Sequence, residues 1–211
     1  GNIDQIMVSH YSQGSVAAIG NGNQIMNIII LVLSSMTVAT TVLISRYFGA
    51  GDPEKAKSVS NASIYSLSFF SIVVTLLIYG FQRPLFQWLQ VPNDILDETC
   101  SYTVIVSTCI LIQAIYMVFA SILRSHKLMK YVTFVAIIMN TLNILGNAIL
   151  INGLFGFPRL GIIGAAISTN ISKFIGLVII ILVFLKKTNM GLGFLNLKYF
   201  SFKMAKKVLL I

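Results

Sequence analysis

The sequence has little charge and little of what catalytic or metal sites need. Only 10% of its 211 residues are charged, whereas a soluble domain carries about 25%. Its two cysteines, Cys100 and Cys109, lie about 13 Å apart along one predicted helix, too far for a disulfide. His10 and His126 have no cysteine or histidine at metal-ligand spacing, and no nucleophile or phosphate-loop pattern accompanies them. The sequence therefore predicts no enzyme and no cofactor.

Acidic residues are scarce, with 6 against 15 basic residues and a net charge of +9. Such an excess is found in nucleic-acid-binding proteins, but there the basic residues gather on one folded face. Here they stand in short clusters between long apolar runs. We therefore expect the charge to set membrane topology, and we expect no nucleic-acid partner.

Long apolar runs dominate what is present: 56% of residues are hydrophobic and the mean hydropathy is +0.87. The run from Asn23 to Phe48 is interrupted only by carboxamides near its start, small or hydroxyl residues, and an Arg near its end. Its 24 residues to Arg46 would form a helix of roughly 36 Å, enough to cross a hydrocarbon core of about 30 Å. Gly49 and Gly51 then predict a helix end, and Asp52-Pro53-Glu54 predicts the capped start of another.

The same pattern predicts four further spans and part of one more. Residues 1–11 give about half a span, and residues 12–22 and 82–98 are expected to be connections on the outer side. The predicted fold class is an all-α polytopic transmembrane bundle with a truncated first helix and five full spans, at residues 23–48, 59–81, 100–123, 131–154 and 162–185.

Basic residues divide unevenly between the two ends of these spans. Twelve fall on one side and two, Arg83 and Arg159, on the other. By the positive-inside tendency, loops 48–58 and 124–130 and the tail 186–211 are cytoplasmic in a plasma (inner) membrane protein. We divide the chain into a bundle, 1–187, and a linker, 188–211. The linker either lies on the inner surface as an amphipathic segment or leads toward a further span, which we favour.

Polar side chains recur at one depth of three predicted spans. Helical rise places Asp4, Asn143, Asn147 and Thr169 about 10–16 Å, and Lys173 about 18 Å, from the outer ends of their helices. Buried ionised groups are costly in a membrane, so this pattern indicates a cation site or proton relay. Simpler interpretations remain open: Asp4 at a frayed terminus, Lys173 extending along its stem, and the Asn residues bonding between helices.

A second set of side chains predicts a substrate cavity. Methionine and aromatic walls adapt to organic cations of different shapes, although small hydroxyl residues also mark simple close packing of helices. The candidates are Met26, Asn27, Thr37, Gln113, Tyr116 and Met139.

Four segments of the sequence resemble the multidrug and toxic compound extrusion (MATE) transporters. The likeness covers the whole chain and is most specific at its longest segment, NTLNILGNAILINGLFGFPRLGIIGAAISTNISK. The other three segments are NIDQIMVSHYSQGSVAAIGNGNQI, VLISRYFGAGDPEKAK and ILRSHKLMKY.

The resemblance implies the N-terminal six-helix half of a transporter with two such bundles, which exports organic cations or amphipathic drugs in exchange for H⁺ or Na⁺. It implies a cation site, with Na⁺ as one possible occupant, at Asp4, Asn143, Asn147, the backbone near Ala165, and Thr169. Asn147 departs from members with a second acid there. We add the hypothesis that Lys173 pairs with Asp4 in one state. A lipid-linked oligosaccharide or polysaccharide flippase, or a non-transporting scaffold, is the alternative.

Overall fold

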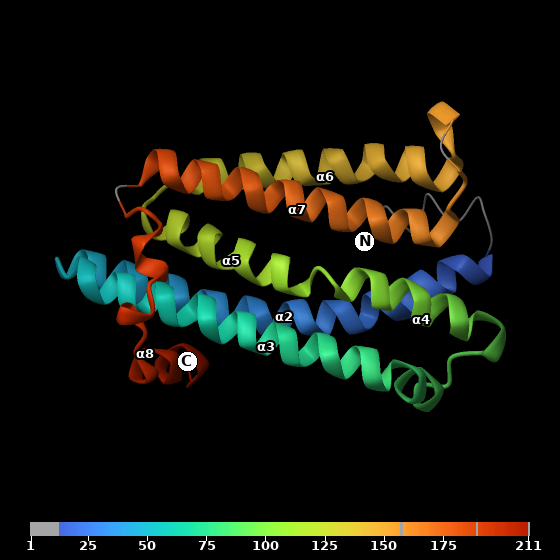
Figure 1. Ribbon diagram of the computed structural model, residues 1–211, viewed down its shortest axis with the longest axis horizontal. Coiled ribbons are helices and arrows are strands. Elements are labelled where there is room, and N and C mark those ends of the chain that lie inside the picture. The colour runs from blue at the N-terminus through green and yellow to red at the C-terminus, as the bar shows by residue number, and fades with distance from the viewer. Residues whose placement is uncertain (1–12, 157, 189, 211) are drawn as a thin grey trace. The chain divides into compact units, whose positions relative to one another are not determined.

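The computed structural model describes residues 13–156, 158–188 and 190–210, so Asp4 lies outside the described residues. No strand occurs among them. The helices in Figure 1 are, in chain order, α2 (Gln13–Gly49), α3 (Pro53–Trp88), α4 (Asn93–Ser107), α5 (Ile110–Ser125), α6 (Met129–Asn152), η1 (Leu154–Gly156), α7 (Gly161–Lys187), η2 (Leu192–Leu195), η3 (Leu197–Tyr199) and α8 (Phe202–Leu210).

Within the described part of the chain, four helices are long and apolar enough to cross a bilayer: α2, α3, α6 and α7. Helices α4 and α5 make a fifth span if this interrupted pair crosses as one. Large apolar side chains such as Leu31 and Phe69 are 68% and 71% exposed, as expected where a helix faces lipid. The predicted all-α bundle of membrane-spanning helices is confirmed, while the half-span predicted at residues 1–11 lies outside the described residues.

The turn between α2 and α3 forms as its sequence predicts. Gly51 adopts a positive φ of 71°, and Pro53 occupies the first position of α3. The Asp52 carboxylate accepts a hydrogen bond from the backbone N–H of Lys55 at 3.0 Å. The Lys55 ammonium also donates to that carboxylate, and these contacts hold the pKa of Asp52 below its usual range.

Two predicted outer connections are helical instead. Residues 13–22 belong to α2, although their glycine, serine and asparagine content is typical of a loop. Gly22 explains the difference, because a Cβ there would lie 2.7 Å from the Tyr102 ring and 2.8 Å from Thr103 Oγ1. Close packing against α4 thus overrides local propensity.

The second connection, predicted at 82–98, shrinks to residues 89–92. Helix α3 continues through Pro84 to Trp88, and α4 begins at Asn93. Proline in a helix interior removes one backbone hydrogen bond, a loss that membrane helices tolerate better than soluble ones.

The span predicted at 100–123 is interrupted in the structure. Helix α4 ends at Ser107 and α5 begins at Ile110. The Asn170 side chain on α7 donates to the Ile105 carbonyl at 2.6 Å and to Thr108 Oγ1 at 3.0 Å. Backbone groups without a helical hydrogen bond are costly in a membrane. At this interruption, Asn170 provides one such carbonyl with a donor.

The chain divides into two compact units, and each helix longer than 20 residues contributes to both. One unit comprises residues 1–29, 73–110 and 138–175, and contains α4 with one half of α6 and of α7. The other comprises residues 30–72, 111–137 and 176–211. Its core includes a cluster of three aromatic rings, Phe119, Phe184 and Phe194, with centroids 5.1–6.3 Å apart.

Candidate functional site

Helices α6 and α7 run next to each other (Figure 1) and approach closely at two glycines. A Cβ on Gly164 would lie 2.6 Å from the Leu150 carbonyl oxygen, and one on Gly146 would lie 2.4 Å from Ser168 Oγ. Neither space admits a side chain without movement of its neighbours. Small residues at such positions let membrane helices come close enough for side chains to bond directly across the interface.

Direct bonds form where the sequence predicts the cation site. The Asn143 carboxamide donates from Nδ2 to Thr169 Oγ1 at 3.1 Å. Ser168 Oγ donates to the Asn143 backbone carbonyl at 3.0 Å. The structure therefore brings two of the predicted site residues into contact, and it adds a hydroxyl that binds the backbone of one of them.

The other predicted residues lie on the same helix pair. Asn147 is fully buried one turn from Asn143, and Ala165 is fully buried one turn from Thr169. Lys173 is half-buried one turn further along α7. All belong to one compact unit. Asp4 and its predicted pairing with Lys173 fall outside the described residues and stay a prediction.

The predicted substrate-cavity residues are not gathered in this way. Met26, Thr37 and Tyr116 are buried, with 3%, 2% and 8% of their surface exposed. The Thr37 hydroxyl donates to carbonyls of its own helix, at Leu33 and Ser34. Asn27 is exposed, and Gln113 and Met139 are half-buried. The six residues are divided between the two compact units, so their common cavity stays a prediction.

Sequence reasoning missed Ser168, the two close-packed glycines and Asn170. A signal was present, because Gly164, Ser168 and Ser172 repeat at four-residue spacing along α7, a pattern of small residues typical of helix interfaces. Asn170 gave no comparable signal, since its partners are a backbone carbonyl and a hydroxyl at a helix interruption that the sequence did not indicate.

A cavity of about 270 Å³ lies apart from these residues, where α4 faces the start of α7. Two carboxylates line it: Glu98 accepts a hydrogen bond from Ser15 Oγ at 3.3 Å, and Asp97 pairs with Arg83 at 3.0 Å. The remaining lining residues are Ser101, Leu160, Gly161, Ile162 and Ile163. Because its acids already have partners, we assign no chemistry to this cavity.

The chain is similar in sequence to known transporters over most of its length. The family described as MatE matches residues 1–149. An uncharacterized transporter, YisQ, from Bacillus subtilis is 37% identical over 193 residues, which is 92% of this chain and 42% of that protein. A probable multidrug resistance protein, NorM, from Thermotoga maritima is 28% identical over 89% of this chain and 40% of its own length.

Solved structures show the same fold. An inward-facing multidrug resistance MATE family transporter of the MOP superfamily superposes with a TM-score of 0.89 at 24% identity. The match covers 99% of this chain and 47% of the solved chain, the extent of one lobe. The chain thus spans about two fifths of its sequence relatives and just under half of its structural neighbour.

Proposed function

Because the chain belongs to the MATE family of transporters, as the match over residues 1–149 shows, we propose that it forms the N-terminal lobe of a cation-coupled exporter. The same membership confirms that the chain is a transporter component and not an enzyme. The proposed cargo is a small organic cation or an amphipathic drug, exchanged for entering H⁺ or Na⁺ across the plasma membrane. A second six-helix bundle is the proposed partner, and loops 48–58 and 124–130 and the tail 186–211 face the cytoplasm.

The contact between Asn143 and Thr169 is the observation that carries this proposal. A carboxamide and a hydroxyl supply oxygen atoms, the ligands that hard cations prefer. They meet within about one turn of the closely packed Gly146 and Ser168, along the length of two membrane-spanning helices. Polar groups at such a depth are favourable only with a protein or ion partner. Asp4 would supply the negative charge that a cation or proton requires.

Transport then follows from exchange of partners at this site. When a cation enters, the Asn143 and Thr169 oxygens turn toward it, and the bond between them is replaced by contacts to the ion. Rocking of one bundle against the other would carry the change across the membrane, as in other transporters built from repeats. Lys173, the basic residue at this depth, would compete with an entering cation for the Asp4 carboxylate. A single lysine offers little to the pyrophosphate of a lipid-linked sugar, so we do not propose a flippase.

The test is ion-driven efflux of a cationic dye from vesicles that contain the full-length protein. Asp4→Asn is expected to abolish efflux, and Asn143→Leu to reduce its dependence on the imposed H⁺ or Na⁺ gradient. Asn152→Leu is the matched control, because Asn152 is exposed at the end of α6 and donates to Ala148 of its own helix. Unchanged gradient dependence in both site variants would contradict the proposal.

A further inference from the structure

The segment after α7 is held against the bundle by side chains of α3. Asn61 Nδ2 donates to the carbonyls of Phe194 and Asn196 at 2.7 and 3.1 Å. Tyr65 donates to the Leu195 carbonyl at 2.9 Å, and Ser58 to that of Tyr199 at 2.9 Å. These three α3 residues, Ser58, Asn61 and Tyr65, form a tail clamp. The clamp fixes the backbone from which α8 begins.

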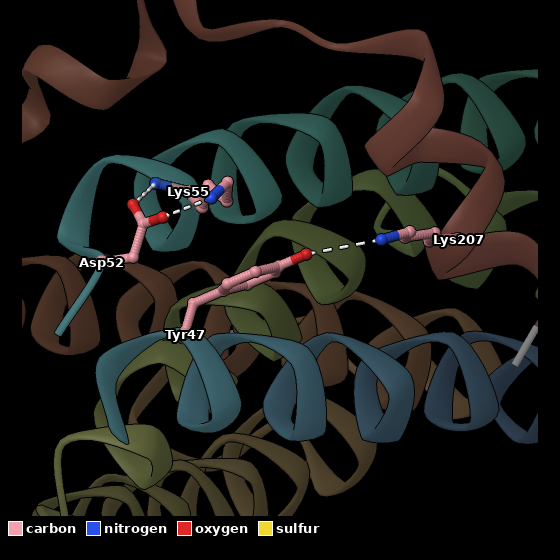
Figure 2. A network of polar contacts seen from close by, with 4 residues as sticks. All are labelled: Tyr47, Asp52, Lys55 and Lys207. Carbon is pink, nitrogen blue, oxygen red and sulfur yellow. Dashed lines mark hydrogen bonds and ion pairs between the residues drawn. The ribbon is translucent and has the colours of Figure 1, made fainter. Parts of the chain in front are cut away.

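Helix α8 is then fixed with one face toward the bundle and one toward the outside. Ala205 and Val208 are 6% and 1% exposed. Lys207 reaches across to the Tyr47 hydroxyl of α2 at 3.4 Å, as Figure 2 shows. The opposite face carries Phe202, which is 78% exposed, together with Lys203 and Lys206. A short helix with exposed lysines and an exposed aromatic ring is typical of a membrane surface.

The depth of α8 agrees with that placement. The lipid-exposed apolar side chains of α2 run to Val42, which is 54% exposed. Tyr47, the contact of Lys207, lies five residues further along, about 7.5 Å by helical rise. Each polar headgroup layer of a bilayer is about 5–7.5 Å thick. The basic face of α8 therefore lies at the level of the headgroups.

Among the described residues, no ion pair involves Lys203 or Lys206. The sequence contains no Asp or Glu after Glu98, whereas residues 186–207 contain six lysines. The acids that begin α3 are already paired, Asp52 with Lys55 (Figure 2) and Glu54 with Lys57. Lys203 and Lys206 are thus available to an anionic partner outside the chain.

We propose that the exposed face of α8, formed by Phe202, Lys203 and Lys206, is a docking site for the headgroups of anionic phospholipids. This inference goes beyond transport and does not depend on it. The lysines contact the phosphates while Phe202 enters the interface between headgroups and acyl chains. The tail clamp ties residues 194–199 to α3, and Lys207 joins α8 to Tyr47 of α2. Lipid bound here therefore holds the segment that follows α7 at a fixed depth beside the bundle.

Native mass spectrometry of the full-length protein, titrated with phosphatidylglycerol or phosphatidylcholine in detergent, tests this proposal. Each basic residue near an anionic surface contributes several-fold to binding, so Lys203→Gln/Lys206→Gln should weaken phosphatidylglycerol binding at this site on the order of ten- to thirty-fold. Phosphatidylcholine binding should not change. Lys127→Gln/Lys130→Gln removes the same charge from exposed positions in the connection after α5 and the first turn of α6, and should leave the site intact.

Three outcomes would overturn the proposal: unchanged phosphatidylglycerol affinity in the α8 variant, an equal loss for both lipids, or preferential binding of a DNA duplex that requires Lys203 and Lys206. The substituted side chains are exposed, so both variants are expected to fold. A thermal unfolding temperature equal to that of the unsubstituted protein would show that both variants fold. The control variant and the transport assay separate failure of lipid docking from failure of the proposed exporter.

Discussion

The α6–α7 pair and the tail clamp each join two segments of the chain through hydrogen bonds of an asparagine, but they use different acceptors. At α6–α7 the Asn143 carboxamide meets another side chain, the Thr169 hydroxyl. In the tail clamp, Asn61 meets main-chain carbonyls of a segment that has only short 3₁₀ turns. A side-chain partner can turn toward an ion, whereas a carbonyl outside a regular helix depends on the partner that reaches it. We infer that the first arrangement is exchangeable and the second is structural.

The largest expected effect concerns the close packing on which the α6–α7 contact depends. In Gly164→Ala the new Cβ would meet backbone atoms of Leu150, which cannot rotate away. Overpacking of this kind costs about 1–3 kcal/mol. The free energy of unfolding in a detergent titration of the purified protein should fall by that amount.

Gly80→Ala is the control for this substitution. Gly80 also lies inside a membrane helix, α3, but nothing lies within 4 Å of its added Cβ. Because alanine favours helix more than glycine does, Gly80→Ala should be neutral or stabilise by up to about 1 kcal/mol. Equal losses in the two variants would show that the α6–α7 interface is not tightly packed.

The sequence predicted the parts of the molecule that depend on composition and on residues typical of turns and helix caps. Four of the predicted apolar runs correspond to single helices long enough to span a bilayer, and the fifth corresponds to the interrupted pair α4–α5. Gly51, Asp52 and Pro53 predicted the turn between α2 and α3 with its cap. Both signals are local: one is set by bilayer thickness and the other by backbone conformation. The α6–α7 contact could also be anticipated, because helical rise places Asn143 and Thr169 at similar depths.

What the sequence did not predict depends on distant partners. The composition of the start of α2 predicts a loop, and the residues that explain its helix, Tyr102 and Thr103, pack against Gly22 from a distant part of the chain. The interruption between α4 and α5 is bonded by Asn170, which lies about 60 residues later. The tail clamp was missed for a similar reason. Its acceptors are backbone carbonyls of a distant segment, and because every residue has a backbone carbonyl, the sequence does not indicate which ones will be bonded.

A loss of similar size, but confined to one segment of the chain, is expected at the tail clamp. Asn61→Ala would leave the Phe194 and Asn196 carbonyls without this donor, and losing a partner to a buried group costs about 1–3 kcal/mol. The loss is local, so backbone amides of residues 192–208 should exchange faster with deuterium while those of α6 and α7 do not. Asn152→Ala is the control, since Asn152 is exposed and donates within its own helix. Faster exchange throughout the bundle would contradict a clamp that acts on the tail alone.

The smallest effect is expected at the Asn143–Thr169 bond. A double-mutant cycle with Asn143→Ala and Thr169→Val should give a coupling of about 0.6 kcal/mol, the average for hydrogen bonds between membrane helices. Ser172→Ala paired with Asn143→Ala is the control, because Ser172 donates to the Ser168 and Thr169 carbonyls of its own helix and should show no coupling. A weak bond is what an exchangeable site requires, since an entering ion must replace it. A coupling well above about 1.7 kcal/mol, the largest value typical of such bonds, would make the pair structural and remove the difference from the tail clamp.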